Sequence, residues 1–289
     1  MSAERESLEV LRREIDLVDD EMHSLLMRRA ELVRRIGVLK GGAELAYRPS
    51  REAQIVRRLV RGHTGALPKA ELALVWRQLL GATARLQTDF AIAVLARDGT
   101  PGPYWEIARG HYGGGATLVE YGSPNQVVVS VAGGTASVGL LPLPQEDDEE
   151  PWWPKLLQTS VGAPKVVARL PFVPPAKQRA SALEALVIMN APVEPSGEDR
   201  SLIVLECEGQ SSRAAMTAAL RADDLEPALH LVWDDPDRAG IRLHLLDAEG
   251  FIEPDIGRFA TIGEHAGTRV ESVVRLGAYA APLAPEELT

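Results

Sequence analysis

Apolar residues recur at alternating spacings of three and four through the first 40 positions of the chain, with polar residues between them. This spacing is typical of a helix that buries one narrow stripe along its whole length. The pattern predicts a single helix over 6–40, about 50 Å long at about 1.5 Å per residue. The stripe consists of Leu8, Leu11, Ile15, Val18, Met22, Leu25, Leu32 and Ile36.

One position of this stripe is charged, because Arg29 follows Leu25 at the same spacing. A buried guanidinium is costly unless an anion or a carboxylate pairs with it. Arg12, beside the stripe, and Lys40, at the end of the predicted helix, raise the same requirement. The helix therefore carries three cations suited to an anionic ligand. The arginines expected on solvated helix surface are Arg13, Arg34, Arg35, Arg57 and Arg58.

Two shorter helices follow, over 49–62 and 68–87, each opened by a proline, which suits the first turn of a helix. Glu52, at the inner edge of the second helix, and Thr83 and Gln87, on the apolar side of the third, are polar where apolar residues are expected. Buried polar groups need partners, which a polar ligand could supply. The apolar side of the third helix is expected to carry Leu72, Val75, Trp76, Leu79, Thr83 and Leu86.

The first helix is much longer than the other two, so a second copy of the chain is needed to cover its stripe, and we expect an interlocked homodimer. Beyond residue 90, short apolar runs alternate with turns over 90–143, which is an α/β pattern. Residues 201–276 then read strand, helix, strand, strand, helix, strand, an order typical of a ferredoxin-like sandwich. We therefore expect a helical domain over 1–89, an α/β region over 90–198 and an α+β domain over 199–289.

Composition and charge narrow the function. The 289 residues, 45% of them hydrophobic, are typical of a globular protein of two or three small domains. A single cysteine and no membrane-length apolar run favour a cytoplasmic protein without membrane association. The six histidines lack ligand spacing, so no metal or other cofactor is expected. Residues 1–90 hold 16 Lys and Arg against 13 Asp and Glu within a chain of net charge -10, which favours a small anionic ligand over nucleic acid.

The polar positions of the three helices fall into a known pattern. Residues 8–87 resemble the all-helical class of chorismate mutases, through segments 11–16, 25–40 and 48–52 and through Gln87. That family forms an intertwined three-helix dimer that converts chorismate to prephenate, and the resemblance implies the same here. Arg48 is a departure, since some relatives carry an acidic residue at this position.

The resemblance also implies a role for each polar residue. Arg29 and, from the other subunit, Arg12 would hold the two substrate carboxylates. Lys40 and Gln87 would donate hydrogen bonds to the ether oxygen, and Glu52 would accept one from the ring hydroxyl. The rearrangement is pericyclic, so a site without histidine or cysteine suits it. The pocket would also be lined by Arg51 and Thr83.

The rest of the chain resembles a second enzyme of the same route. Residues 90–198 are similar to a shortened prephenate dehydratase domain, through segments 98–100 and 139–143, and 201–279 to its ACT regulatory domain. The dehydratase catalytic signatures are absent, since Pro144-Gln145-Glu146 replaces Glu-Asn-Ser and 184–186 replaces Thr-Arg-Phe. The resemblance thus implies a regulatory or structural C-terminal half without dehydratase activity. Its loops at 209–212 and 233–236 depart from the usual effector residues, which leaves open an aromatic amino acid effector, another ligand, or a purely architectural role.

Two other functions remain as alternatives. Isochorismate pyruvate-lyases resemble the same helical bundle, although Glu52, Thr83 and Gln87 favour the mutase. The bundle could also have become a non-catalytic ligand sensor or interaction module. Against this, a site freed from catalysis has no need to keep Lys40 and Gln87 together.

Overall fold

The computed structural model describes residues 8–39, 47–87, 90–96, 102–157, 163–174, 183–209, 211–236 and 238–289. The three predicted N-terminal helices are confirmed as α1 (Leu8–Leu39), α2 (Pro49–Arg61) and α3 (Lys69–Ala84). Pro49 lies in the first turn of α2, and Gly62 caps its end. Helix α3 ends three residues before the predicted boundary, so Gln87 lies in the turn that follows it.

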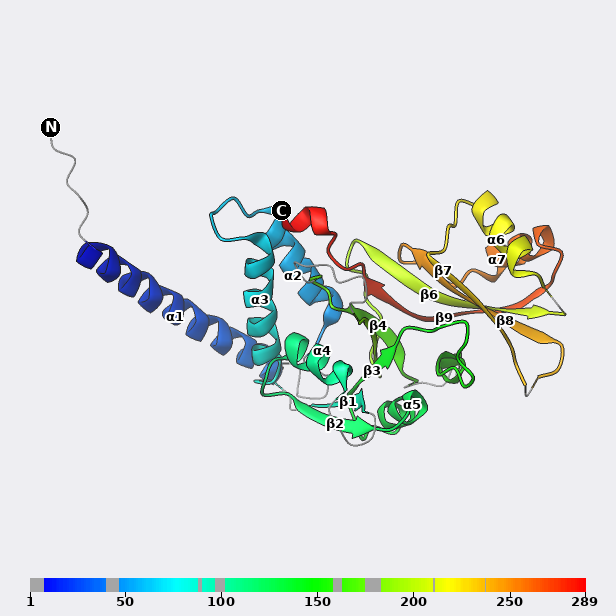
Figure 1. The fold of residues 1–289 in the computed structure, drawn as a ribbon, viewed down its shortest axis with the longest axis horizontal. Helices are drawn as coiled ribbons and strands as arrows, with labels where there is room; N and C mark the ends of the chain where they lie inside the picture. The colour runs from blue at the N-terminus through cyan, green and yellow to red at the C-terminus, as the bar shows by residue number, and fades with distance from the viewer. Residues whose placement is uncertain are drawn as a thin grey trace.

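Helix α1 projects from the remainder of the molecule as a single arm (Figure 1). None of its residues is buried, and its apolar stripe is between 38% exposed, at Leu11, and 63% exposed, at Leu8. Its contact with the rest of the chain is made with α3, near the C-terminal end of α1. The part of the chain that the structure describes contains no helix with the length and apolar character to cross a membrane.

Nine strands form one mixed sheet in the order β2-β1-β3-β5-β4-β9-β6-β8-β7. Helices α4 (Pro103–Tyr112) and α5 (Pro124–Ala132) accompany the strands of its first half. The strands of this half are β1 (Ala91–Leu95), β2 (Thr117–Tyr121), β3 (Val138–Pro142), β4 (Lys165–Leu170) and β5 (Ala185–Met189), with a 3₁₀ turn at Trp153–Leu157.

The second half confirms the predicted βαββαβ order. Its elements are β6 (Asp199–Glu208), α6 (Arg213–Ala222), β7 (Leu229–Asp234), β8 (Ile241–Glu249), α7 (Ile256–His265) and β9 (Val270–Ala280), before a 3₁₀ turn at Pro285–Leu288. The antiparallel strands lie in the order β9-β6-β8-β7, and α6 and α7 pack on one face of them. Cys207 is buried in this core, as a small apolar side chain would be.

The two halves share the sheet through one close contact between β4 and β9, which run parallel. A Cβ on Gly277 would lie 2.0 Å from the carbonyl oxygen of Val166, so only glycine fits at this crossing. Trp152 and Trp153 are buried in a core that includes strands of both halves. The sheet therefore runs without a break across the boundary expected near residue 198.

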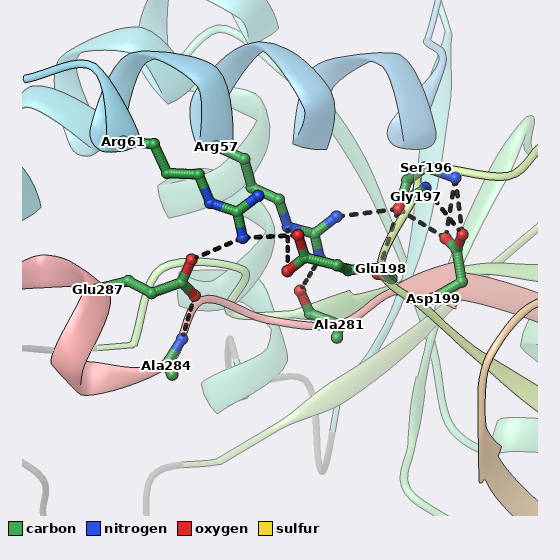
Figure 2. Close-up of polar contacts among 9 residues, drawn as sticks. All are labelled: Arg57, Arg61, Ser196, Gly197, Glu198, Asp199, Ala281, Ala284 and Glu287. Carbon is green, nitrogen blue, oxygen red and sulfur yellow. Dashed lines mark hydrogen bonds and ion pairs between the residues drawn. The ribbon is translucent and has the colours of Figure 1, made fainter.

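A buried arginine, Arg57, connects helix α2 to the C-terminal half through hydrogen bonds (Figure 2). The prediction that Arg57 is solvated was wrong, since its side chain is only 5% exposed. It donates hydrogen bonds to the Oγ of Ser196 at 3.0 Å and to the carbonyl oxygens of Glu198 at 2.9 Å and Ala281 at 2.5 Å. Burial lowers the pKa of Arg57, while the Glu198 carboxylate opposes that shift. The arginines found exposed, as predicted, are Arg13, Arg34, Arg35 and Arg58.

One turn further along α2, Arg61 forms ion pairs with Glu198 at 2.6 Å and Glu287 at 3.1 Å (Figure 2). Arg61 is 53% exposed, so its pairs lie at the surface. Apolar residues of α2 and α3 also pack against Phe172 and Leu283. The helical region thus docks on the sheet through polar and apolar contacts together.

Candidate functional site

Arg29 finds a partner within its own chain. Its Nη1 donates a hydrogen bond to the Oγ1 of Thr83 at 2.8 Å, which joins α1 to α3. Thr83 in turn donates from its hydroxyl to the carbonyl oxygen of Leu79, at 2.8 Å, one turn back in α3. Arg29 is partly buried, and desolvation lowers its pKa while the carboxylate of Glu52 raises it. Two predicted site residues, Arg29 and Thr83, are therefore in contact, and a third, Glu52, acts electrostatically on Arg29.

Glu52 lies in the first turn of α2 and is buried, as predicted. Its Oε2 lies 2.9 Å from the Nη2 of Arg77, and the two side chains are 8% and 5% exposed. Burial raises the pKa of Glu52, whereas Arg77 and Arg29 act to lower it. A carboxylate in this position is a strong acceptor, provided that Arg77 keeps it ionised.

The same guanidinium continues into a second contact. Arg77 Nη2 is hydrogen-bonded to the Nε2 of His111, from α4, and the hydroxyl of Tyr47 lies 3.0 Å from that nitrogen. Burial, with Arg77 adding to it, lowers the pKa of His111 well below its usual value, so the imidazole is neutral. Arg77 can only donate, and its Nη2 also lies 3.2 Å from Nδ1, so it donates to the ring nitrogen that carries no proton. Burial also raises the pKa of Tyr47, which remains a phenol.

Gln87 packs on the backbone of α1. A Cβ at Gly37 would lie 3.0 Å from the Cγ of Gln87, so a glycine at this turn of α1 makes room for the glutamine side chain. Lys40, three residues beyond Gly37 in the sequence, lies outside the described residues. Arg29, Thr83 and Gln87 thus gather where the C-terminal half of α1 meets α3 and the turn after it, and Glu52 of α2 acts electrostatically on Arg29.

Three arginines lie away from this cluster. Arg12 is exposed and stands 17 residues before Arg29, which is about 25 Å along the same helix. Arg51 is exposed, and its Nη1 donates to the side chain of Gln54 at 3.3 Å. Arg48 forms an ion pair with Glu194, in the loop before β6. One copy of the chain therefore leaves Arg12 remote from the cluster, and Arg48 serves to attach α2 to the sheet region.

The sequence patterns did not predict Arg77 or His111 as site residues. The predicted apolar side of α3 was wrong at two positions, since Val75 is 54% and Leu86 53% exposed, whereas Thr83 is buried and Leu72, Trp76 and Leu79 are partly buried. The buried stripe is Ala73, Arg77, Leu80 and Ala84, which keeps the helical spacing but contains weakly apolar or charged members. Arg77 could have been found as Arg29 was, as a cation on a helical stripe. No local pattern pointed to His111, since it meets Arg77 across 34 residues of chain.

Gln145, Glu146 and Glu184, where the resemblance places the dehydratase signatures, make polar contacts with other residues. Glu146, beyond β3, pairs with Arg213 of α6 at 2.7 Å, and the backbone amide of Gln145 donates to Asp148 at 2.9 Å. Glu184, before β5, pairs with Arg169 of β4 at 2.8 Å. These residues therefore tie adjacent strands and helices together.

The helical region is similar to known proteins. Residues 11–88 match the family model of chorismate mutase type II. The bifunctional chorismate mutase/prephenate dehydratase of Pseudomonas aeruginosa is 26% identical over 148 residues, which cover 49% of this chain and 40% of that protein. The enzyme of the same name from Aquifex aeolicus is 34% identical over 100 residues, or 33% of this chain and 28% of that protein.

The match to the Pseudomonas aeruginosa protein is longer than the helical region and so extends into the sheet region. The aligned parts nevertheless cover less than half the length of these relatives. Among solved structures, the prephenate dehydratase of Streptococcus mutans aligns with a TM-score of 0.45 and 14% identity, over 67% of this chain and 100% of that one.

Proposed function

We propose that the protein rearranges chorismate to prephenate, because residues 11–88 match the family model of chorismate mutase type II. The observation that carries the proposal is that this matched segment contains the whole predicted set of polar residues. Within it, Arg29 is joined to Thr83 beside the buried carboxylate of Glu52. The proposed set is Arg12, Arg29, Lys40, Arg51, Glu52, Thr83 and Gln87.

The chemistry that such a site needs is clamping and charge stabilisation. In the rearrangement a C–O bond breaks while a C–C bond forms, so the enzyme gains most by holding the dianion in its folded conformer. Arg29, fixed by Thr83, would bind one carboxylate. Lys40 and Gln87 would stabilise the charge that grows on the ether oxygen in the transition state, and Glu52 would accept from the ring hydroxyl.

The second carboxylate would be held by the Arg12 of a second copy. The apolar stripe of α1 is 38% to 63% exposed in one chain, and α1 projects from the molecule as an arm. Such a stripe is stable in water when it is covered. A partner helix along it would bring a distant arginine to the cluster, so we propose a homodimer with shared sites.

For the C-terminal half we propose a regulatory or structural role without dehydratase activity. The support is that Glu146 and Glu184, at the positions of the missing signatures, are occupied in ion pairs. An aromatic amino acid remains the effector to test first, because residues 201–279 resemble the ACT regulatory domain of prephenate dehydratases.

The test is the loss of chorismate absorbance with the purified full-length protein, with prephenate and phenylpyruvate followed in the same samples, with and without each aromatic amino acid. Prephenate without enzymatic phenylpyruvate is the expected result. If phenylpyruvate forms faster than prephenate decays without enzyme, the C-terminal half has dehydratase activity. No consumption of chorismate would overturn the mutase and favour a binding module.

A further inference from the structure

We propose that Arg77 and His111 are positioning residues of the mutase site, so that the α/β region completes a site built on the helical domain. Arg77 pairs with the carboxylate of Glu52 and holds it in place, and His111 holds Arg77. This inference rests on the proposed function for its activity tests. It adds a residue from α4, which lies outside the segment matched by the mutase family.

The contacts form one chain of partners from Glu52 to α4. Arg77 Nη2 lies 2.9 Å from Glu52 Oε2 and is hydrogen-bonded to His111 Nε2, while the hydroxyl of Tyr47 lies 3.0 Å from the same imidazole nitrogen. As whole residues, Glu52, Arg77 and His111 are 6%, 4% and 8% exposed, and Tyr47 is 3% exposed. Since all four side chains are buried, each has few positions available other than the one that its neighbours fix.

Several groups among the described residues act on the charge state of Glu52. The cations are Arg77 from α3 and Arg29 from α1, and both favour the carboxylate. Tyr47 and Tyr112 lie near it as buried phenols, and His111, on the far side of Arg77, is a neutral imidazole. Burial raises the pKa of Glu52, and Arg77 is the largest of the influences that oppose this shift.

His111 is suited to hold Arg77 because it is neutral. A charged imidazole would repel the guanidinium, whereas the neutral ring offers one unprotonated nitrogen as an acceptor. The side chain of Gln78, next to Arg77 in sequence, makes a similar bridge from α3 to α4, donating to the carbonyl oxygen of Gly110 at 2.9 Å. Gln78 is exposed and does not touch Glu52, so it provides a matched control for the loss of an α3–α4 bridge.

The first test is the pH profile of chorismate turnover for Arg77→Met and Gln78→Met in the full-length protein. Without Arg77, the ionisation of Glu52 moves to higher pH, so the acid limb of kcat/KM should shift upward by about 1–3 pH units. Activity is then low in acid and recovers as the pH rises through the raised pKa. Gln78→Met should keep the wild-type profile. An unshifted acid limb in folded Arg77→Met would overturn the role of Arg77.

The second test separates positioning from bulk and does not require Arg77→Met to fold. His111→Gln places an amide oxygen near the position of Nε2, whereas His111→Leu offers no acceptor. We expect kcat/KM near wild type for His111→Gln and a loss of up to about 100-fold for His111→Leu, as for a small misplacement at a reacting centre. Equal activity in the two variants would overturn the role of His111.

A measurement without turnover keeps this inference distinct from the proposed function. The carboxyl ¹³C resonance of Glu52, assigned with Glu52→Gln, should titrate at higher pH in Arg77→Met and His111→Leu than in the wild type or His111→Gln. A wild-type protein that leaves chorismate unchanged would end the mutase proposal, and this titration would still decide the coupling. Identical titrations in all four proteins would show that α4 does not act on Glu52.

Discussion

Arg57 should stabilise the docking of the helical region on the sheet far more than Arg61, although both lie on α2 and both reach Glu198. Arg57→Met keeps the apolar stem of the side chain and removes its donors. The carbonyl oxygen of Glu198 retains the amide of Ala281 at 2.9 Å, so the loss falls mainly on the carbonyl oxygen of Ala281. A buried acceptor that loses a charged donor costs about 1.5–3 kcal/mol, and we expect a net loss of about 2–3 kcal/mol.

Arg61→Met provides the control. Arg61 is 53% exposed and its two ion pairs lie at the surface, so their removal should cost about 0–1 kcal/mol in total. Urea unfolding followed by circular dichroism and by tryptophan fluorescence gives the free energy of unfolding for the three proteins. The reasoning would be refuted if Arg57→Met lost no more stability than Arg61→Met, or if high salt removed the effect of Arg57→Met as it should that of Arg61→Met.

Three further outcomes are expected. Arg29→Ala should abolish most chorismate turnover and leave the circular dichroism spectrum unchanged, whereas near-normal turnover would remove Arg29 from the site. Arg12→Ala subunits mixed with Lys40→Ala subunits should regain activity through hybrid sites, and no regain after confirmed exchange would exclude a shared pocket. Burial lowers the pKa of His244 to about 3 from 6.5. As the pH falls, the unfolded chain therefore takes up a proton at His244 before the folded protein does. The contribution of His244 to the free energy of unfolding is complete above the unfolded pKa and should fall by about 2 kcal/mol between about pH 6.5 and 5. His244→Gln should reduce this dependence on pH in urea titrations.

The local patterns of the sequence predicted most of the helices and strands and part of the candidate site. The spacing of apolar residues predicted α1 to α3 and the order of the C-terminal half, because burial of one face determines both. It also singled out Arg29 and Glu52, as charged residues on stripes that pack against other helices. These features depend on neighbours within one or two turns, which is the range over which a sequence pattern carries information.

The contacts between regions could not be read in the same way. Arg57 was expected on the surface, because arginine on a short helix is usually solvated, and its acceptors lie 139 to 224 residues away. The contact between β4 and β9 requires glycine at position 277, and this requirement can be recognised only when both strands are placed side by side. Backbone carbonyls that accept from a buried arginine have no sequence signature at all, because every residue carries one.

The missed contacts also change how the helical region should be regarded. Helix α2 meets Arg77 and, through it, His111 at its N-terminal turn, and it meets the C-terminal half through Arg57 near its other end. Removing the sheet would expose Val56, Val60 and the aromatic ring of Tyr47, and would leave the guanidinium of Arg57 without the acceptors that it now has. The segment that matches the mutase family is therefore not an independent unit in this protein, and the orientation of Glu52 depends on residues that a description of that family alone would leave out.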